Sequence, residues 1–385
     1  MSKPCSGNCL ACGKCVNLPV LEAFHAGNQI REPREGYGVA VDIGTTTVVM
    51  ALVDLATGIL LSRHSFLNPQ RVYGPDVISR INAANEGKLQ DMRGIIIHDT
   101  LNGLNLLLRN KDIPPKALRE VVVAGNTTMM HLLMGYSCAE IGVSPFKITA
   151  RLKPSYAFQD VFGGSTISCP VTVLPWFAAF VGGDIMAGLL NVMTMGNRFF
   201  LLVDLGTNGE MASYQDGTLI VTSTAAGPAF ESAAHGGGAS EVVSELASLV
   251  RTGVLDETGL INGDTVFTQK QIRDLQLAKS AVRSGIEILM SLTDAPGGVP
   301  DAVYLAGGIG QAMNVEDAVQ IGLIPRGMAV RAQPVGNASL GGAVRALLAP
   351  MQTASDRDAL LGHVTEINLA EQKMFNDAFM TYMFF

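Results

Sequence analysis

The 385-residue sequence lacks several features, and each absence excludes a class of protein. Charged residues make up only 16% and hydrophobic residues 48%, so the chain is not intrinsically disordered. Acidic residues outnumber basic ones by 34 to 27, which argues against nucleic acid or an anionic membrane as a partner. The first 20 residues contain no apolar signal core, and the sequence has no G-x-x-x-x-G-K-[ST] P-loop.

An uninterrupted membrane-spanning run is also missing. The stretch from Leu174 to Val192 is long enough, but it contains Pro175, Gly182-Gly183 and Asp184. A charge at the centre of a bilayer is costly, so we interpret this stretch as protein core. We therefore expect a cytoplasmic protein without a membrane span.

Cysteines are few, and four of the six lie at the N-terminus. Cys138 and Cys169 are isolated, and we expect them to be small buried residues. The others are Cys5, Cys9, Cys12 and Cys15, spaced C-x3-C-x2-C-x2-C. Structural zinc sites usually separate two cysteine pairs by a longer loop, whereas closely spaced thiolates are typical of iron–sulfur ligands. We predict an iron–sulfur cluster, [4Fe–4S] from the ligand count, in residues 1–20, with zinc or no metal as alternatives.

The remaining sequence contains one α/β pattern twice. Residues 38–58 and 199–217 both have a strand–turn–strand pattern, and Asp204 repeats Asp42 at an offset of 162 (204 − 42). Strands ending at Ala124 and Ala306 form a second pair, at an offset of 182 (306 − 124). Such ordered pairs indicate a duplicated fold.

Helical periodicity separates these strands, over residues 75–109, 128–135 and 268–292. Alternating strands and helices predict two α/β subdomains facing a central cleft. We assign a linker to 21–37, the subdomains to 38–197 and 198–350, and a helical extension to 351–385.

Both strand pairs enclose a turn suited to phosphate. The first contains Asp42, Gly44, Thr45, Thr46 and Thr47, and the second contains Asp204, Gly206, Thr207 and Asn208. Glycine lets backbone N–H groups approach a phosphate, threonine adds hydroxyl donors, and the carboxylate can bind Mg²⁺ through water. One such turn is a weak signal, because plain hairpins share the pattern, but two turns across a cleft can hold phosphates from both sides. We predict that the two aspartates are catalytic and that the other residues bind ATP or ADP.

A third glycine-rich segment follows the strand that ends at Ala306. Gly307, Gly308 and Gly310 can bring backbone against a nucleoside, or they can form a tight strand–helix turn. Asn126 and Thr127 start a helix, either as caps or as contacts in the cleft.

Further polar residues have two interpretations each. Asp184 is a cleft-facing acid or a buried structural acid. Glu210 positions the attacking water or is a solvated turn residue, and Lys279 reaches the ribose or a phosphate or is a solvated helix lysine. We interpret His131 and His235 as structural.

The two turns, the late glycine segment and the duplication resemble the superfamily of sugar kinases, Hsp70 and actin ATPases. Within it, several blocks resemble the reductive activators of corrinoid-dependent proteins. These blocks are NPQRVYGPDVISRI (68–81), AGNTTMMHLLMG (124–135), VDLGTNGEM (203–211), AAGPAFE (225–231), TQKQIRDLQLAKSAVRSGI (268–286), LAGGIG (305–310) and GNASLGGA (336–343). The similarity extends from residue 38 to the C-terminus.

This resemblance implies a function. Such proteins use ATP to return an inactive Co(II) corrinoid protein to Co(I), with electrons from a low-potential donor. The partners implied are a corrinoid protein or methyltransferase and a reduced ferredoxin or flavodoxin-like donor, and we also consider a homodimer. The better-known activators carry an N-terminal ferredoxin-like domain with a [2Fe–2S] cluster, where this sequence has its four cysteines.

Three other functions fit parts of the sequence. One is an activator of another low-potential enzyme, such as a 2-hydroxyacyl-CoA dehydratase. Such activators usually share one cluster between two subunits, unlike the four local cysteines here. A small-molecule kinase would need an acceptor substrate and a general base. A nucleotide-dependent binding module would hold only structural zinc.

Overall fold

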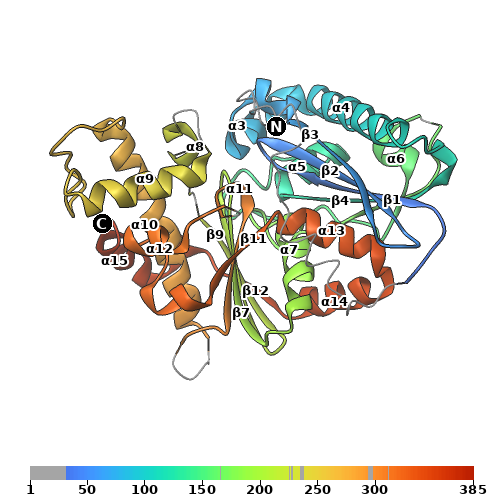
Figure 1. Ribbon diagram of the computed structural model, residues 1–385. Coiled ribbons are helices and arrows are strands. Elements are labelled where there is room, and N and C mark those ends of the chain that lie inside the picture. Colours follow the sequence, from blue (N-terminus) through green and yellow to red (C-terminus); the bar gives the residue numbers. More distant parts are fainter. Residues whose placement is uncertain are drawn as a thin grey trace, which may run out of the picture. The chain divides into compact units, whose positions relative to one another are not determined.

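The computed structural model describes residues 32–164, 166–224, 226, 229–234, 238–293, 298–310 and 312–385. The chain divides into two compact units (Figure 1). Unit 1 extends to Thr194 and includes Ala338–Asp358, and unit 2 comprises Met195–Asn337 and Ala359–Phe385. The four N-terminal cysteines and His235 lie outside the described residues, and so does the predicted metal site.

Unit 1 contains a six-stranded sheet in the order β3-β2-β1-β4-β6-β5. Its strands are β1 (Tyr37–Ile43), β2 (Thr47–Asp54), β3 (Leu60–Leu67), β4 (Leu118–Gly125), β5 (Tyr156–Ala157) and β6 (Pro170–Val173). β1 and β4 are parallel and lie in the middle of the sheet. Continuous apolar runs, Val39–Val41 and Val121–Ala124, are fully buried in them, as expected for strands that are covered on both faces.

Helices cover both faces of this sheet. Helix α4 packs against β2, β3 and α5 on one face, and α7 and α13 pack against β4 and each other on the opposite face (Figure 1). The helical elements are η1 (Pro69–Tyr73), α3 (Val77–Ala83), η2 (Ala84–Lys88), α4 (Leu89–Arg109), η3 (Pro115–Ala117), α5 (Thr127–Met134), α6 (Phe158–Phe162), α7 (Gly183–Val192), η4 (Met193–Met195), α13 (Ala338–Leu348) and α14 (Pro350–Gly362).

Unit 2 contains a second six-stranded sheet, in the order β11-β10-β7-β8-β9-β12. Its strands are β7 (Phe199–Leu205), β8 (Gly209–Gln215), β9 (Thr218–Thr224), β10 (Ala302–Ala306), β11 (Ala332–Gly336) and β12 (Val364–Glu366). The helical elements are α8 (Ala229–Ala233), α9 (Ala239–Arg251), α10 (Gln269–Ser291), α11 (Gly307–Gly310), α12 (Val315–Gln320), η5 (Arg326–Arg331), η6 (Leu369–Glu371) and α15 (Lys373–Thr381). Helix α10 packs against β8, β9 and α15.

The two sheets confirm the predicted α/β duplication. β1–β2–β3 and β7–β8–β9 are both antiparallel, and β4 and β10 both add in parallel to the first strand of their set. Asp42 pairs in register with Ala124, and Asp204 pairs with Ala306. The two pairs of equivalent positions found in the sequence are therefore neighbours across the same strand pair in each unit.

The two units are not continuous in sequence, in contrast to the predicted subdomains. The predicted boundary at residue 350 divides residues 338–358 between the second subdomain and the C-terminal extension, but in the structure they belong to unit 1. The reason is the packing of α13, whose small and apolar residues are buried against α7 and β1.

The apolar stretch from Leu174 to Val192 is protein core, as predicted. Only its last ten residues are helical, as α7, and nine of these are buried. No helix among the described residues is both long and apolar enough to cross a membrane. Cys138 and Cys169 are 1% and 9% exposed, which confirms their prediction as buried residues, and burial raises the pKa of their thiols to about 12 and about 11.

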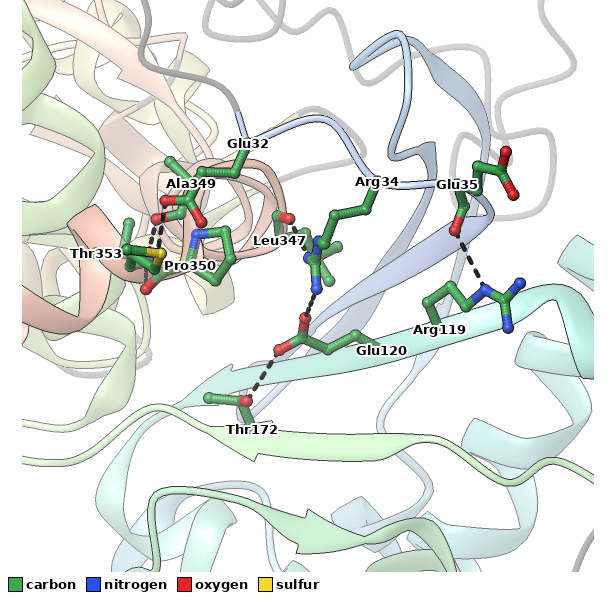
Figure 2. Close-up of polar contacts among 11 residues, drawn as sticks. Glu32, Arg34, Glu35, Arg119, Glu120, Thr172, Leu347, Ala349, Pro350 and Thr353 are labelled. Atoms are coloured by element: carbon green, nitrogen blue, oxygen red, sulfur yellow. Dashed lines mark hydrogen bonds and ion pairs between the residues drawn. The ribbon is translucent and has the colours of Figure 1, made fainter.

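The first described residues are fixed to unit 1 by polar contacts (Figure 2). The guanidinium of Arg34 donates to Glu120 Oε2 at 3.0 Å and to the Leu347 carbonyl at 2.6 Å. The carboxylate of Glu32 accepts a bond from the Met351 amide at 3.0 Å, in the first turn of α14. The chain that follows the cysteine-rich residues therefore joins unit 1 beside α13 and α14.

Candidate functional site

The predicted first turn connects β1 to β2 in unit 1. Asp42 lies one residue before the end of β1, and its carboxylate accepts a bond from Ser339 Oγ of α13 at 2.8 Å. Thr45 is buried at 6% exposure, and its hydroxyl accepts a bond from Asn126 Nδ2 at 2.9 Å. Thr46 is exposed and Thr47 half-buried.

Asn126 is both a helix cap and a contact of the first turn, so the two interpretations of this residue are compatible. Its Oδ1 accepts a bond from the Met129 amide at 2.9 Å, which caps α5, while its Nδ2 donates to Thr45. The position follows from the sheet, because Gly125 pairs with Ile43 and Asn126 is the next residue. Thr127 is buried and donates to the Ala178 carbonyl at 2.6 Å.

A close backbone approach brings the start of α7 to the same place. A Cβ atom at Gly182 would lie 2.5 Å from the Thr127 amide nitrogen, so only glycine fits. Asp184 follows in the first turn of α7, half-buried, and one of its oxygens accepts the Ile185 amide at 2.9 Å. Unit 1 thus brings together residues 42–47, 125–127 and 182–184.

The second turn connects β7 to β8 in unit 2 and is tighter. The Gly206 amide bonds the Asn208 carbonyl at 2.9 Å, whereas in the first turn the Gly44 amide bonds the Thr47 carbonyl at 3.0 Å. Thr207 is buried, and its hydroxyl donates to Glu231 Oε1 of α8 at 3.2 Å.

A pair of acids lies beside the second turn. Asp204 and Glu210 are directly opposite each other on β7 and β8. Opposite residues of an antiparallel pair share a face, with Cβ atoms about 5 Å apart. Glu210 is only 6% exposed, so its interpretation as a solvated turn residue is wrong. In unit 1 the residue opposite Asp42 is Val49, so this acid pair is specific to unit 2.

Gly307 lies against the second turn. Its φ is +81°, and a Cβ atom there would overlap Asp204 Oδ1 and lie 2.6 Å from the Leu205 carbonyl oxygen. Gly308 is exposed, and a Cβ atom there would meet no atom within 4 Å. Gly310 is buried at the end of α11. The segment therefore brings backbone to the acid pair and leaves open space beside Gly308.

Lys279 lies inside unit 2, on helix α10. It is 1% exposed, so it is not a solvated helix lysine. Its ammonium donates to the carbonyls of Tyr382 and Phe384 at 2.6 and 2.5 Å. Helix α10 uses this lysine to hold the last residues of the chain, and contact with a nucleotide stays a prediction.

These arrangements can bind a phosphorylated ligand and a divalent cation. In unit 2, the backbone of Gly206–Asn208 and Gly307 lies near two carboxylates, and hard oxygen ligands of this kind suit Mg²⁺. Over the part of the chain that the structure describes, no group of three or more His, Cys, Asp or Glu residues could hold a metal alone. A Mg²⁺ ion brought with nucleotide phosphates requires fewer protein ligands.

Some site residues were not predicted. Ser339 and Glu231 contact the turns from far away in the sequence, and the signal that could have found them is the pair of blocks GNASLGGA and AAGPAFE in which they lie. His131 is structural, as predicted. It is buried, its Nδ1 lies 2.9 Å from the Ser137 carbonyl, and its ring contacts those of Tyr136 and Trp176.

Two family models together match almost the whole described chain. The model described as the RACo middle region matches residues 37–197. The model described as the C-terminal domain of RACo, the ASKHA domain, matches residues 198–245 and 252–385.

Individual relatives agree with these matches. The corrinoid activation enzyme RamQ of Eubacterium limosum is 29% identical over 413 residues, covering 89% of this chain and 69% of RamQ. The [Co(II) methylated amine-specific corrinoid protein] reductase of Methanosarcina barkeri is 27% identical over 209 residues, 51% of this chain and 37% of the reductase. The solved structure of a reductive activator for corrinoid, iron–sulfur protein superposes with a TM-score of 0.81 at 28% identity, covering 93% of this chain and 67% of the activator.

Proposed function

Because the chain belongs to the RACo family, we propose that it is an ATP-dependent reductive activator that returns a corrinoid protein from Co(II) to Co(I). The names of its relatives support the corrinoid substrate. The single observation that carries the proposal is the match to both RACo regions over nearly all of the described residues.

The geometry of unit 2 supports the nucleotide part of the proposal. The support is that two carboxylates, Asp204 and Glu210, lie opposite each other beside the close backbone approach of Gly307, a combination suited to phosphate oxygens and Mg²⁺. When Mg²⁺ is bound, Asp204 would help to hold it, and the buried Glu210 would orient a water molecule for attack on the terminal phosphate. Unit 1 supplies a second phosphate-binding turn, with Asp42, Gly44 and the threonines.

The nucleotide and the electron transfer have separate roles. Bound ATP with Mg²⁺ supplies free energy through its different affinity for two conformations of the protein. Cys5, Cys9, Cys12 and Cys15 would hold the iron–sulfur cluster, and the chemistry it would supply is one-electron transfer at low potential. A reduced ferredoxin or flavodoxin-like protein would be the source of the one electron that converts Co(II) to Co(I).

A single substitution tests the nucleotide site. Asp204→Asn should reduce ATP hydrolysis in the presence of a Co(II) corrinoid protein by about 100-fold or more, because a charged ligand of Mg²⁺ is lost. Asp216→Asn is the matched control, since Asp216 lies on the surface of the same unit, where its carboxylate pairs with Arg198. Unchanged hydrolysis by Asp204→Asn would show that the site is assigned to the wrong residues.

Metal analysis tests the redox part. Anaerobically purified protein should contain about four irons and little zinc per chain, with an iron–sulfur signal in electron paramagnetic resonance after reduction. Stoichiometric zinc without iron would contradict this part of the proposal and leave the nucleotide site unaffected.

A further inference from the structure

All backbone carbonyls of the first turn accept hydrogen bonds from within unit 1. The pairs are Asn68 Nδ2 with the Gly44 carbonyl at 2.8 Å, Arg80 Nη2 with Thr45 at 2.7 Å, the Asn68 amide with Thr46 at 2.9 Å and the Gly44 amide with Thr47 at 3.0 Å. A trans peptide carries its C=O and N–H on opposite sides. The N–H groups of Thr45, Thr46 and Thr47 share peptides with the first three of these carbonyls and therefore point away from Asn68 and Arg80.

Arg80 is a fully buried cation. It is 0% exposed, and its other donors contact the Gly74 carbonyl at 3.0 Å and Met129 Sδ at 3.3 Å. Burial lowers its pKa to about 10, and the nearby Asp76 carboxylate opposes this change, so the guanidinium stays charged at neutral pH. Among the described residues it forms no ion pair with a carboxylate at 4.0 Å or less.

A buried charge without an ion pair is costly. An anion on the far side of the Thr45–Thr46 peptide would compensate part of this charge across a short distance. The turn also has to face that anion with N–H groups and not with carbonyl oxygens, which would repel it.

We propose that Asn68 and Arg80 are positioning residues for the first turn, holding its carbonyls inward so that its N–H groups face a nucleotide phosphate. The inference rests on the proposed function and extends it to residues that do not touch the ligand.

The local sequence explains how the two residues reach the turn. Asn68 caps η1, because its Oδ1 accepts a bond from the Gln70 amide at 2.9 Å. This bond fixes the side chain where its Nδ2 reaches the Gly44 carbonyl. Asp76 caps α3 by accepting the Ser79 amide at 2.8 Å, and this sets the start of the helix that carries Arg80. The block from residue 68 to 81 is therefore a support for the turn.

The test compares Asn68→Asp and Arg80→Lys with the unmodified protein. Asn68→Asp keeps the side-chain oxygen that caps η1 but loses the N–H group that donates to the Gly44 carbonyl. Arg80→Lys keeps the positive charge but loses the planar guanidinium that bonds the Gly74 and Thr45 carbonyls together. Arg93→Lys is the control, because Arg93 also bonds backbone carbonyls in unit 1, those of Leu133 and Val161. Affinities for ATP, ADP and adenosine are measured by calorimetry, with thermal unfolding as a check on folding.

Both variants should bind ATP about ten-fold or more weakly and adenosine within about two-fold of the unmodified protein, since only phosphate contacts are affected. Arg93→Lys should change neither. If Arg80→Lys does not fold, Asn68→Asp decides the question. Equal losses for ATP and adenosine, or no loss, would overturn the inference. If the unmodified protein binds no adenine nucleotide, the proposed function itself fails.

Discussion

Gly307 is the residue at which backbone conformation and the candidate site are most directly linked. With φ at +81° and Asp204 alongside, it has no room for a side chain. Gly307→Ala should destabilise unit 2 by about 1–3 kcal/mol and weaken ATP binding about ten-fold or more. The reason is that the added methyl group strains the backbone at residue 307 and overlaps the Asp204 carboxylate of the acid pair.

The neighbouring glycine provides the control. Gly308→Ala adds a methyl group that meets no atom within 4 Å, so folding should be unchanged. The two variants are compared by urea unfolding and nucleotide titration. Equal behaviour of both variants would mean that the approach of residue 307 to Asp204 does not matter.

The residues of the turns were predictable because strand, aspartate and glycine follow each other at short spacing. Asp204 and Gly307 were found in this way, and the structure places them together. Arg80 and Asn68 were not found as supports, because their partners are backbone carbonyls, which no sequence pattern specifies. The burial of Lys279 was not predicted, because its partners lie more than 100 positions later in the chain.

At the scale of elements, the segment before β1 is fixed by Arg34. Its ion pair with Glu120 has side-chain exposures of 35% and 11%, and Glu120 also accepts a bond from Thr172 at 3.1 Å. Arg34→Ala should reduce the free energy of unfolding of unit 1 by about 1–2 kcal/mol, the lower part of the range for a charged hydrogen bond, because solvent partly screens the pair.

The control for Arg34 is an exposed ion pair. Arg198 and Asp216 are 83% and 52% exposed, so Arg198→Ala should cost about 0–1 kcal/mol. The loss of stability in each of the two variants is measured from the midpoint of its urea unfolding curve. A loss from Arg34→Ala no larger than that from Arg198→Ala would show that the segment is not anchored by this contact.

Helix α10 holds the chain end in a pH-dependent way. Burial, with a smaller contribution from Arg283, lowers the pKa of Lys279 from 10.5 to about 7. Between about pH 7 and pH 10.5 the lysine is therefore mostly protonated in the unfolded chain and mostly neutral in the folded protein. The contribution of this group to the free energy of unfolding rises as the pH increases from about 7 to about 10.5, and it is constant below about pH 7.

Lys279→Met should remove this rise. The free energy of unfolding is measured at about pH 7 and about pH 9.5 for the variant and for Lys270→Met, which changes an exposed lysine of the same helix. The idea is wrong if Lys279→Met retains the increase seen in the unmodified protein.

The positions of the helices along the chain were more predictable than the elements against which they pack. The apolar period over 268–292 corresponds to α10 at Gln269–Ser291, where Thr268 and Gln271 form a capping box. The period over 75–109 corresponds to α3, η2 and α4, interrupted at Gly87, whose φ is +91°. Hydrophobic spacing specifies a helix, but it does not specify a local break within it.

At the scale of the molecule, the proposal separates the cysteines from the nucleotide site. Changing Cys5, Cys9, Cys12 and Cys15 together to serine should abolish reduction of the corrinoid protein, because the metal would be lost. The affinity for ATP should stay within about two-fold, because these residues precede both turns in the sequence. Cys169→Ala, at a buried thiol, is the control. Corrinoid reduction that survives the fourfold change would mean that the electron comes directly from another protein.

The duplication was predictable because two pairs of motifs recur in the same order. The return of residues 338–358 to unit 1 was not, because it depends on the packing of α13 against α7, a contact between segments about 150 positions apart.

Strand β1 has the segment that follows the cysteines at one end and the first turn at the other. Five residue steps separate Tyr37 from Asp42, about 17 Å at 3.3 Å per residue. Any influence of a bound phosphate on the place where that segment joins unit 1 is therefore allosteric and not by contact. Such coupling is reciprocal. If the N-terminal cysteines hold a redox-active metal, the factor by which ATP changes its reduction equilibrium equals the factor by which reduction changes the affinity for ATP.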